Sequence, residues 1–349
     1  MTGRTGDSQC RASHALVLVQ PTPFERLGRL SGILGVNLWA KRDDLYPLTG
    51  GGNKARKIVL IAAEAEKSGC NALVTCGGAQ SNHCRVVALV AAAKGWRCRL
   101  LIHADPKETI PPRGNFLLMK LAGAEIEFIR LQDAAEAMRS AMRDLVDQGV
   151  RPFEIVGGGH SVAGAIAYVT AVDELAGQCK ADGWQPDWLI HASGTGTTQA
   201  GIAVGIERLG WPTRVVGISV ARGKARGTQV IEQSCSEIRK HLGFVGAPRA
   251  VDFRDTWVGE GYEKAGPEVL DAIRLACRTE GLVLDPTYTG KAFAGLLSMV
   301  GDGEIASGSK VLLWHTGGLL NLMASADVLP FESPNRARPD VDEMRSLPS

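Results

Sequence analysis

Several features that would place this chain in a common functional class are missing from its sequence. The charge balance is nearly even, with 39 lysines and arginines against 37 aspartates and glutamates, so nothing indicates a nucleic-acid or membrane-surface protein. No run reaches about 18 uninterrupted apolar residues, so no membrane span is expected. The polar start, MTGRTGDSQCRASHALVLVQPTP, lacks the apolar stretch of a signal peptide. We therefore expect a cytoplasmic protein.

The eight cysteines also lack the spacing of a functional cluster. None forms a C-x-x-C pair or a zinc pattern, and no group of His, Asp and Glu has metal-ligand spacing, so no metal is expected. A G-x-S-x-G nucleophile elbow is missing as well. The cysteines are interpreted as small core residues of a reduced protein.

Strand-like and helix-like patterns alternate along the chain from Lys54 onward. Short apolar segments that end in small residues, such as NALVTCGG and DWLIHASG, predict strands, and the longer segments between them predict helices. This alternation is typical of βαβ units, so we expect an α/β fold with mostly parallel sheets flanked by helices. The length of 349 residues fits two open, twisted sheets better than a single one.

The segment TGGGNKARK, residues 49–57, raises the first question about chemistry. A P-loop reads G-x-x-x-x-G-K-[ST], with a hydroxyl residue after the lysine to hold magnesium. Here Asn53 separates Gly52 from Lys54, and Ala55 stands where the hydroxyl residue belongs. The pattern argues against a P-loop, so Lys54 needs another role.

A second glycine-rich turn, ASGTGTTQAG, follows the strand pattern that ends at Ala192. Backbone N–H groups and hydroxyls at a helix start suit a phosphate group. The turn resembles the dinucleotide fingerprint G-x-G-x-x-G, with Gly194 and Gly196 in place, but Gln199 occupies the third glycine position. The acidic ribose partner is also missing, although Arg222 would suit an NADP-binding oxidoreductase. A cradle for one phosphate is favoured, and an ordinary strand-to-helix turn is the alternative.

The segment CGGAQSNHCR, residues 76–85, joins another predicted strand to a helix. Gln80, Ser81 and Asn82 lie at the helix start, where side-chain donors and free N–H groups make a receptor for a carboxylate. Ser81 acting only as a helix cap is the alternative. A lysine, a phosphate cradle and a carboxylate receptor together indicate pyridoxal 5′-phosphate, which needs a Schiff-base lysine, a phosphate site and an amino-acid pocket.

Four segments carry a resemblance to a known family. KRDDLYPLTGGGNKARK, GGAQSNHCR, LDPTYTGKA and WHTGG, in this order, are similar to the D-cysteine desulfhydrase and 1-aminocyclopropane-1-carboxylate deaminase family. These are pyridoxal-phosphate enzymes of the tryptophan-synthase-β fold (fold type II). The resemblance runs from Pro21 to Ala326 and implies a homodimer. The expected organisation is a large cofactor-binding domain (residues 15–57 and 165–332), a small domain (58–164) and flexible tails (1–14 and 333–349).

The resemblance implies cofactor-binding roles for residues in each of the four segments and in the glycine-rich turn. Lys54 would hold the cofactor as a Schiff base and then act as the base at the substrate's Cα. Asn82 would bind the cofactor's 3′ oxygen, and Thr316 would approach its pyridine nitrogen. The phosphate would lie against Gly194, Thr195, Gly196, Thr197 and Thr198. Because a neutral hydroxyl at Thr316 leaves the ring uncharged, rapid loss of a leaving group is favoured over transamination.

Substrate-facing roles are implied as well. Gln80 and Ser81 would receive the substrate carboxylate, Ser81 and Tyr288 would act in catalysis, and Tyr288 and Tyr262 would line the substrate pocket. A surface-loop position is the alternative for Tyr262. Thr289, counted with the cofactor site, matches the desulfhydrase branch, since cyclopropane deaminases carry a glutamate there.

The expected reaction is β-elimination from a small amino acid, with D-cysteine giving pyruvate, ammonia and hydrogen sulfide. The alternatives are opening of 1-aminocyclopropane-1-carboxylate, sulfite loss from cysteate, and a pathway-specific pyridoxal-phosphate lyase. They stay open because the GTGTTQAG turn departs from the Ser-Ala-Gly-Thr type of loop expected in desulfhydrases. An NADP-binding oxidoreductase and a catalytically silent binding protein are the competing classes.

Overall fold

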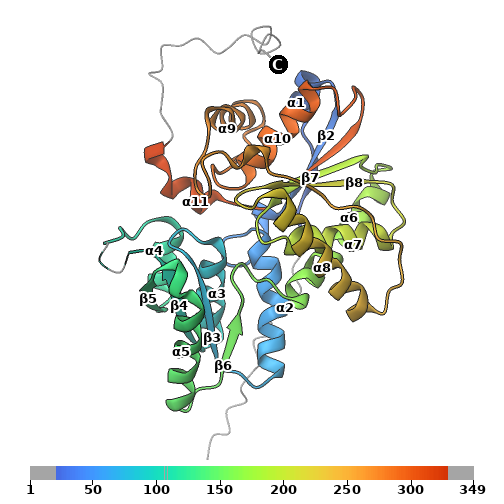
Figure 1. The fold of residues 1–349 in the computed structure, drawn as a ribbon. Coiled ribbons are helices and arrows are strands. Elements are labelled where there is room, and N and C mark those ends of the chain that lie inside the picture. Colours follow the sequence, from blue (N-terminus) through green and yellow to red (C-terminus); the bar gives the residue numbers. More distant parts are fainter. Residues whose placement is uncertain (1–20, 106, 108, 329–349) are drawn as a thin grey trace, which may run out of the picture.

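The computed structural model describes residues 21–105, 107 and 109–328 of the chain. These residues form two β-sheets with helices packed against both faces of each (Figure 1). The predicted flexible tails, 1–14 and 333–349, lie outside the described residues. Within the described ranges, no helix is both long and apolar enough to cross a membrane.

The larger sheet contains six strands, of which only the first pairs antiparallel to its neighbour. In spatial order the strands are β1 (Phe24–Arg26), β2 (Asn37–Arg42), β10 (Lys310–His315), β7 (Trp188–Ser193), β8 (Arg214–Ser219) and β9 (Asp252–Arg254). The sequence prediction of mostly parallel sheets is confirmed. It missed the strands β1 and β9, because three-residue strands carry too little periodicity to detect, and it assigned no element to the segment before Lys54, which holds β2.

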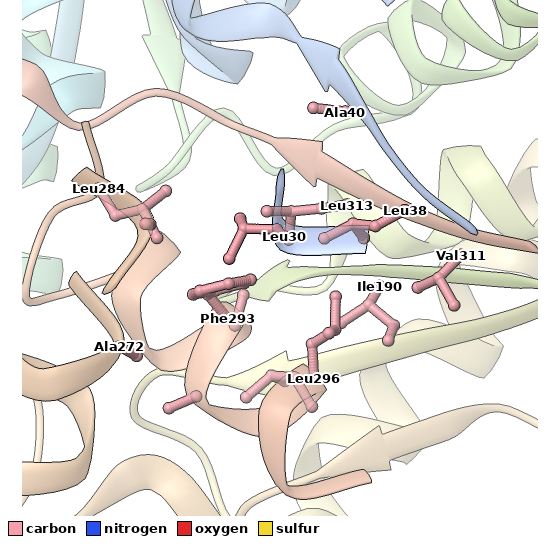
Figure 2. Close-up of a cluster of buried hydrophobic side chains, with 14 of the residues drawn as sticks. Leu30, Leu38, Ala40, Ile190, Ala272, Leu284, Phe293, Leu296, Val311 and Leu313 are labelled. Atoms are coloured by element: carbon pink, nitrogen blue, oxygen red, sulfur yellow. The ribbon is translucent and has the colours of Figure 1, made fainter. Parts of the chain in front are cut away.

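The central strands of this sheet are buried on both faces, since side chains alternate along a strand. On β10, Val311 and Leu313 join one hydrophobic cluster, whereas Leu312 and Trp314 join another on the opposite face. Figure 2 shows the first cluster, in which Phe293 packs with strand residues. The helices that contribute to this first cluster are α1 (Gly28–Leu34), α9 (Pro267–Glu280) and α10 (Thr289–Gly301). The opposite face of the sheet is covered by α6 (Val162–Ala181) and α7 (Thr197–Arg208). Helix α8 (Lys224–Leu242) packs against α6 and α7.

The smaller sheet contains four parallel strands, all within the segment predicted to form the small domain. Their spatial order is β5 (Glu125–Ile129), β4 (Arg97–His103), β3 (Ala72–Gly78) and β6 (Pro152–Ile155). Leu73 faces one hydrophobic cluster, while Ala72 and Val74 face the cluster built with helix α5 (Ala134–Asp147). The first cluster is covered by α2 (Asn53–Lys67), α3 (Asn82–Ala93) and α4 (Gly114–Leu121).

Helix α2 runs alongside both sheets and connects the two halves of the molecule (Figure 1). Its apolar side, with Ile58 and Ile61, packs into the core of the smaller sheet, and it also contacts α6 of the larger one. The carboxyl ends of β3, β7 and β10 therefore converge near the start of α2. Ligands of α/β proteins bind at such carboxyl ends.

Candidate active site

Lys54 lies in the first turn of α2, where only Asn53 separates it from two glycines whose positions exclude any larger residue. Gly51 and Gly52 have φ angles of 76° and 93°, in the left-handed region. A Cβ at Gly51 would lie 2.1 Å from the carbonyl oxygen of Asp44, and one at Gly52 would lie 3.0 Å from that of Thr316. The glycine run thus lets the backbone pass close to Asp44 and Thr316, which follow β2 and β10, and brings Lys54 to the ends of these strands.

One pocket collects most of the residues predicted for the cofactor. Among the predicted residues, those that line it are Lys54, Asn82, Gly194, Thr195, Gly196, Thr198, Tyr288 and Thr316. Gln80, Ser81, Thr197, Tyr262 and Thr289 lie in the surrounding shell and do not line this pocket. The lining also includes Asn53, Lys57, Ala192, Ser193 and Gly317. It therefore holds two lysines and, among the described residues, no carboxylate.

The amine of Lys54 is enclosed and gives up its proton more easily than that of an ordinary lysine. Its Nζ donates a hydrogen bond of 2.8 Å to the carbonyl oxygen of Gly158, in the glycine turn after β6. Burial lowers the pKa of Lys54 to about 8, because it disfavours the charged form. An amine with this pKa loses its proton readily, as both a Schiff-base nucleophile and a general base require.

The start of α7 forms a concave cradle of N–H groups. Gly196 is the N-cap residue, with a left-handed φ of 87°, and a Cβ there would lie 2.7 Å from the side chain of Ile231. The N–H groups of residues 197–199 precede the first intrahelical hydrogen bond and point out of the helix end. Such a helix end attracts an anion. The Thr198 hydroxyl accepts a hydrogen bond of 3.1 Å from Asn53 Nδ2, which ties the cradle to α2.

Lys57 is a buried cation that the sequence prediction missed. It lies one turn beyond Lys54 on the same face of α2, is about 1% exposed, and lines the same pocket as the cradle. Among the described residues its ammonium has no hydrogen-bond acceptor, and its near neighbour is the Tyr168 ring, 5.9 Å away. Burial and the nearby Lys54 lower the pKa of Lys57 well below its usual value. An anionic group in the pocket would supply the missing counter-charge.

Asn82 presents one defined side of its amide to the pocket. Its Oδ1 accepts hydrogen bonds from Arg85 (3.0 Å) and from Asn115 Nδ2 (3.0 Å). Because the oxygen is occupied, the Nδ2 group is the part of the amide that remains available to a ligand. This donor suits an acceptor such as the 3′ oxygen of pyridoxal phosphate.

Gln80 and Ser81 are both engaged in local hydrogen bonds. Ser81 caps α3, where its hydroxyl accepts a hydrogen bond of 3.2 Å from the N–H of Cys84. Gln80 uses its amide to bridge the carbonyl of Arg113 (3.1 Å) and the N–H of Asn115 (3.0 Å). A substrate carboxylate would then meet the Ser81 hydroxyl hydrogen and the free N–H groups of the first turn of α3.

Tyr288 stands at the start of α10 and meets Tyr262 from the loop after β9. Their hydroxyls are hydrogen-bonded, and the rings pack edge to face with centroids 6.0 Å apart. Burial raises the pKa of the Tyr288 hydroxyl, so it is protonated at neutral pH, whereas the Tyr262 side chain is 41% exposed and lies at the pocket's solvent side. The Asp285 carboxylate fixes the turn by accepting hydrogen bonds from the N–H groups of Thr287, Tyr288 and Thr289 and from the Thr289 hydroxyl (2.7 Å). The Thr289 hydroxyl is thus turned away from the pocket.

The far end of the pocket, at Thr316, is neutral. Adjacent His315 lies with Nδ1 3.2 Å from the N–H of Gly317, from which it accepts a hydrogen bond, and with Nε2 2.9 Å from the carbonyl oxygen of Val283. His160 lies with Nδ1 2.8 Å from the Thr197 hydroxyl. Within the described ranges, no group of His, Cys, Asp and Glu could hold a metal ion.

The whole donor set fits pyridoxal phosphate. A deprotonatable lysine, an N–H cradle with a buried cation beside it, an amide donor and a neutral hydroxyl all face one pocket. The comparisons with known proteins agree with this geometry. Residues 16–317 match the model of the pyridoxal-phosphate dependent enzyme family. The chain belongs to this family, and pyridoxal 5′-phosphate is its cofactor.

Two relatives are similar over most of the chain. A D-cysteine desulfhydrase of Yersinia enterocolitica (serotype O:8 / biotype 1B, strain NCTC 13174 / 8081) is 36% identical over 307 residues, which cover 87% of this chain and 93% of the relative. The crystal structure of a homologue of ACC deaminase superposes with a TM-score of 0.82 at 33% identity, covering 89% of this chain and 93% of the other.

More distant structures share the fold alone. A threonine deaminase of T.th. gives a TM-score of 0.61 at 20% identity, covering 86% of this chain and 93% of the other. An L-serine ammonia-lyase of Rhizomucor miehei gives 0.64 at 17% identity, covering 88% and 99%. The predicted fold type II architecture is therefore confirmed.

Proposed function

We propose that this protein is a lyase that eliminates a β-substituent from a small amino acid, with D-cysteine as the substrate. The observation that carries the proposal is the placement of Lys54, the cradle at Gly196 and the Tyr288 hydroxyl on the walls of a single pocket. The products would be pyruvate, ammonia and hydrogen sulfide. The similarity to a D-cysteine desulfhydrase supports this choice of substrate.

Each side chain around the pocket has a role that its contacts suit. When bound, the cofactor supplies the electron sink that makes the substrate's Cα–H acidic. Lys54, whose amine is buried and readily neutral, would take the Cα proton. The first turn of α3 and the Ser81 hydroxyl would bind the substrate carboxylate, and Asn82 Nδ2 would orient the cofactor. The protonated Tyr288 hydroxyl would act beside the departing sulfur.

Position 289 supports a desulfhydrase over a cyclopropane deaminase. The Thr289 hydroxyl is bonded to the buried Asp285 carboxylate, so this position offers no carboxylate to the pocket. The neutral hydroxyl of Thr316 supports elimination, since a pyridine ring held by a hydroxyl would be a weaker electron sink and would favour rapid loss of a β leaving group.

The substrate assignment is tested by measuring sulfide and pyruvate release from D-cysteine, L-cysteine, cysteate and 1-aminocyclopropane-1-carboxylate. We expect D-cysteine to give equal amounts of sulfide and pyruvate and the highest kcat/KM in the panel. Tyr288→Phe should lower kcat by about a hundredfold while the protein stays bound to its cofactor. Turnover of another member of the panel with none of D-cysteine would refute the substrate and leave the cofactor assignment standing.

We further propose the domain boundaries, quaternary structure and location that the resemblance implies. A large domain (15–57 and 165–332) and a small one (58–164) are supported by the two sheets that these segments contribute to. A homodimer is supported by exposed apolar side chains such as Leu121 and Met323, and light scattering would test it. A cytoplasmic location is supported by the free thiols of Cys84 and other buried cysteines.

A further inference from the structure

Arg85, on helix α3, is a buried cation without an acidic partner in the described part of the chain. It is about 2% exposed, and every acceptor that it contacts is neutral. One terminal nitrogen donates to Asn82 Oδ1 (3.0 Å) and Asn115 Oδ1 (2.9 Å), and the other donates to the carbonyl of Gly51 (2.8 Å). Its Nε is buried with no hydrogen-bond partner among the described residues.

This arrangement is costly in the protein alone. A buried guanidinium normally pairs with a carboxylate, because neutral acceptors do not replace the hydration of a full charge. The cost is reflected in the pKa of Arg85, which burial lowers to about 10. A neutral side chain could make the same packing contacts at a lower desolvation cost. The positive charge of Arg85 therefore needs a reason other than packing.

The contacts of Arg85 all lead to the cofactor pocket. Asn82 lines the pocket, and Gly51 belongs to the turn that places Lys54. Asn115 supports the same amide from the side, with Nδ2 donating to Asn82 Oδ1 (3.0 Å) and to the carbonyl of Gln80 (2.9 Å). Arg85 therefore contacts Asn82 directly, and Asn82 is the side chain that would contact the ligand.

We propose that Arg85 is a positioning residue for pyridoxal phosphate, which acts on the cofactor's 3′ oxygen through Asn82. With Asn115, it locks the Asn82 amide so that Nδ2 points at the 3′ oxygen. Its uncompensated charge polarises that amide and favours the negatively charged form of the oxygen. The inference rests on the cofactor and not on which amino acid is the substrate.

The test uses the full-length protein loaded with pyridoxal phosphate, without substrate. Bound cofactor absorbs in the visible when its 3′ oxygen is anionic, and in the near ultraviolet when that oxygen carries the proton. Arg85→Gln keeps polar contacts but removes the charge. We expect it to move absorbance from the visible to the near-ultraviolet band and to weaken cofactor binding by about ten- to a hundredfold. Arg85→Lys should keep the visible band, because it restores the charge.

Arg239→Gln is the matched control. Arg239 pairs with Glu207 (2.6 Å) between α8 and α7 and does not line the pocket, so its loss should leave the spectrum and the cofactor affinity unchanged. Circular dichroism verifies that each variant is folded. Should Arg85→Gln fail to fold, Asn115→Asp replaces it, since an aspartate beside Arg85 would cancel the charge and produce the same spectral change.

A folded Arg85→Gln or Asn115→Asp protein with the wild-type spectrum would overturn the proposal. Equal spectral changes in Arg85→Lys and Arg85→Gln would also overturn it, because they would show that packing matters and charge does not. These outcomes differ from failure of the proposed function, which is judged by product release alone.

Discussion

Two sets of buried charges lie side by side in this protein, and they are balanced differently. The balanced set consists of Lys41, Asp43, Arg56 and Glu174. The unbalanced set consists of Lys54, Lys57 and Arg85. Helix α2 carries members of both, with Arg56 directly beside Lys57 in the sequence.

In the balanced set every charge has an opposite partner. Asp43 is fully buried and accepts hydrogen bonds from Arg56 (2.8 Å), Tyr168 (2.6 Å) and Trp314 (2.8 Å). Glu174 pairs with Arg56 (2.8 Å) and with Lys41. Breaking such a pair leaves a charge without a partner, so this set holds α2, β2 and α6 together.

In the unbalanced set the counter-charge is left to the ligand. Its three cations have no carboxylate partner among the described residues, and two of them line the pocket. The comparison teaches that buried cations at adjacent positions of one helix, Arg56 and Lys57, can serve opposite purposes. The balanced set stabilises the fold, whereas the unbalanced set lowers stability until an anionic cofactor binds.

The largest effect is expected from Lys54→Ala. It removes both the attachment point of the cofactor and the Cα base, so kcat should fall by at least about a thousandfold while the fold stays intact. Steady-state assays with circular dichroism measure both. Lys67→Ala, at the exposed end of the same helix, is the matched control and should retain full activity. A Lys54→Ala protein with wild-type turnover would refute the mechanism.

Asp43→Ala breaks the balanced set. Among the substitutions considered, it should lower the free energy of unfolding the most. It leaves Arg56 with one acidic partner fewer and should lower the free energy of unfolding by about 3–5 kcal/mol. Urea denaturation measures the loss. Asp173→Ala, which removes a surface pair with Arg208, should cost less than about 1 kcal/mol. Similar losses in the two variants would contradict the distinction between the sets.

Lys57→Met sharpens the comparison, because stability and affinity should move in opposite directions. Removing a buried ammonium that has no partner should leave the cofactor-free protein as stable as the wild type, or more stable by about 1 kcal/mol. Cofactor affinity should fall by about ten- to a hundredfold, since the phosphate loses a charged partner. Thermal unfolding and cofactor titration measure the two effects. A destabilised protein with normal affinity would place Lys57 in a structural role.

The pH dependence of stability should also separate the two sets. The pKa of Lys54 falls to about 8 in the folded protein from 10.5, so between these values the unfolded chain binds more protons. The stability of the cofactor-free protein should therefore rise with pH across this window, and less steeply in Lys54→Ala. In the balanced set, Arg56 holds the pKa values of Asp43 and Glu174 below their usual range. Their contribution is present above about pH 4 and is lost as the pH falls further.

Much of the fold was readable from the sequence, because long amphipathic helices alternate with apolar strands. The predicted strand NALVTCGG corresponds to β3, and the predicted helix SVAGAIAYVTAVDELAGQC to α6. The segment before Lys54 was not predicted, since β1 spans only three residues and β2 mixes charged and apolar side chains. A charged residue such as Lys41 is fully buried there, which a hydrophobic pattern cannot anticipate.

For the site, the sequence indicated the residues that carry motifs and missed those that act through burial. Lys54, Asn82 and the 194–198 turn stand in recognisable segments. Lys57 had one usable signal, its position three residues after Lys54 on an apolar helix. Arg85 ends the GGAQSNHCR segment, but nothing in the sequence shows that it is buried without an acidic partner. Its partners Asn115 and Gly51 lie 30 or more residues away in the chain, and only the fold brings them together.

The measurement that tests the central claim most directly is the chemical mapping of the cofactor attachment site. The yellow protein loaded with pyridoxal phosphate is reduced with borohydride, digested and sequenced by mass spectrometry. The account predicts that the pyridoxyl label is on Lys54 and that Lys54→Ala carries none. A label on Lys57 or on the buried Lys291 would contradict the assignment of Lys54.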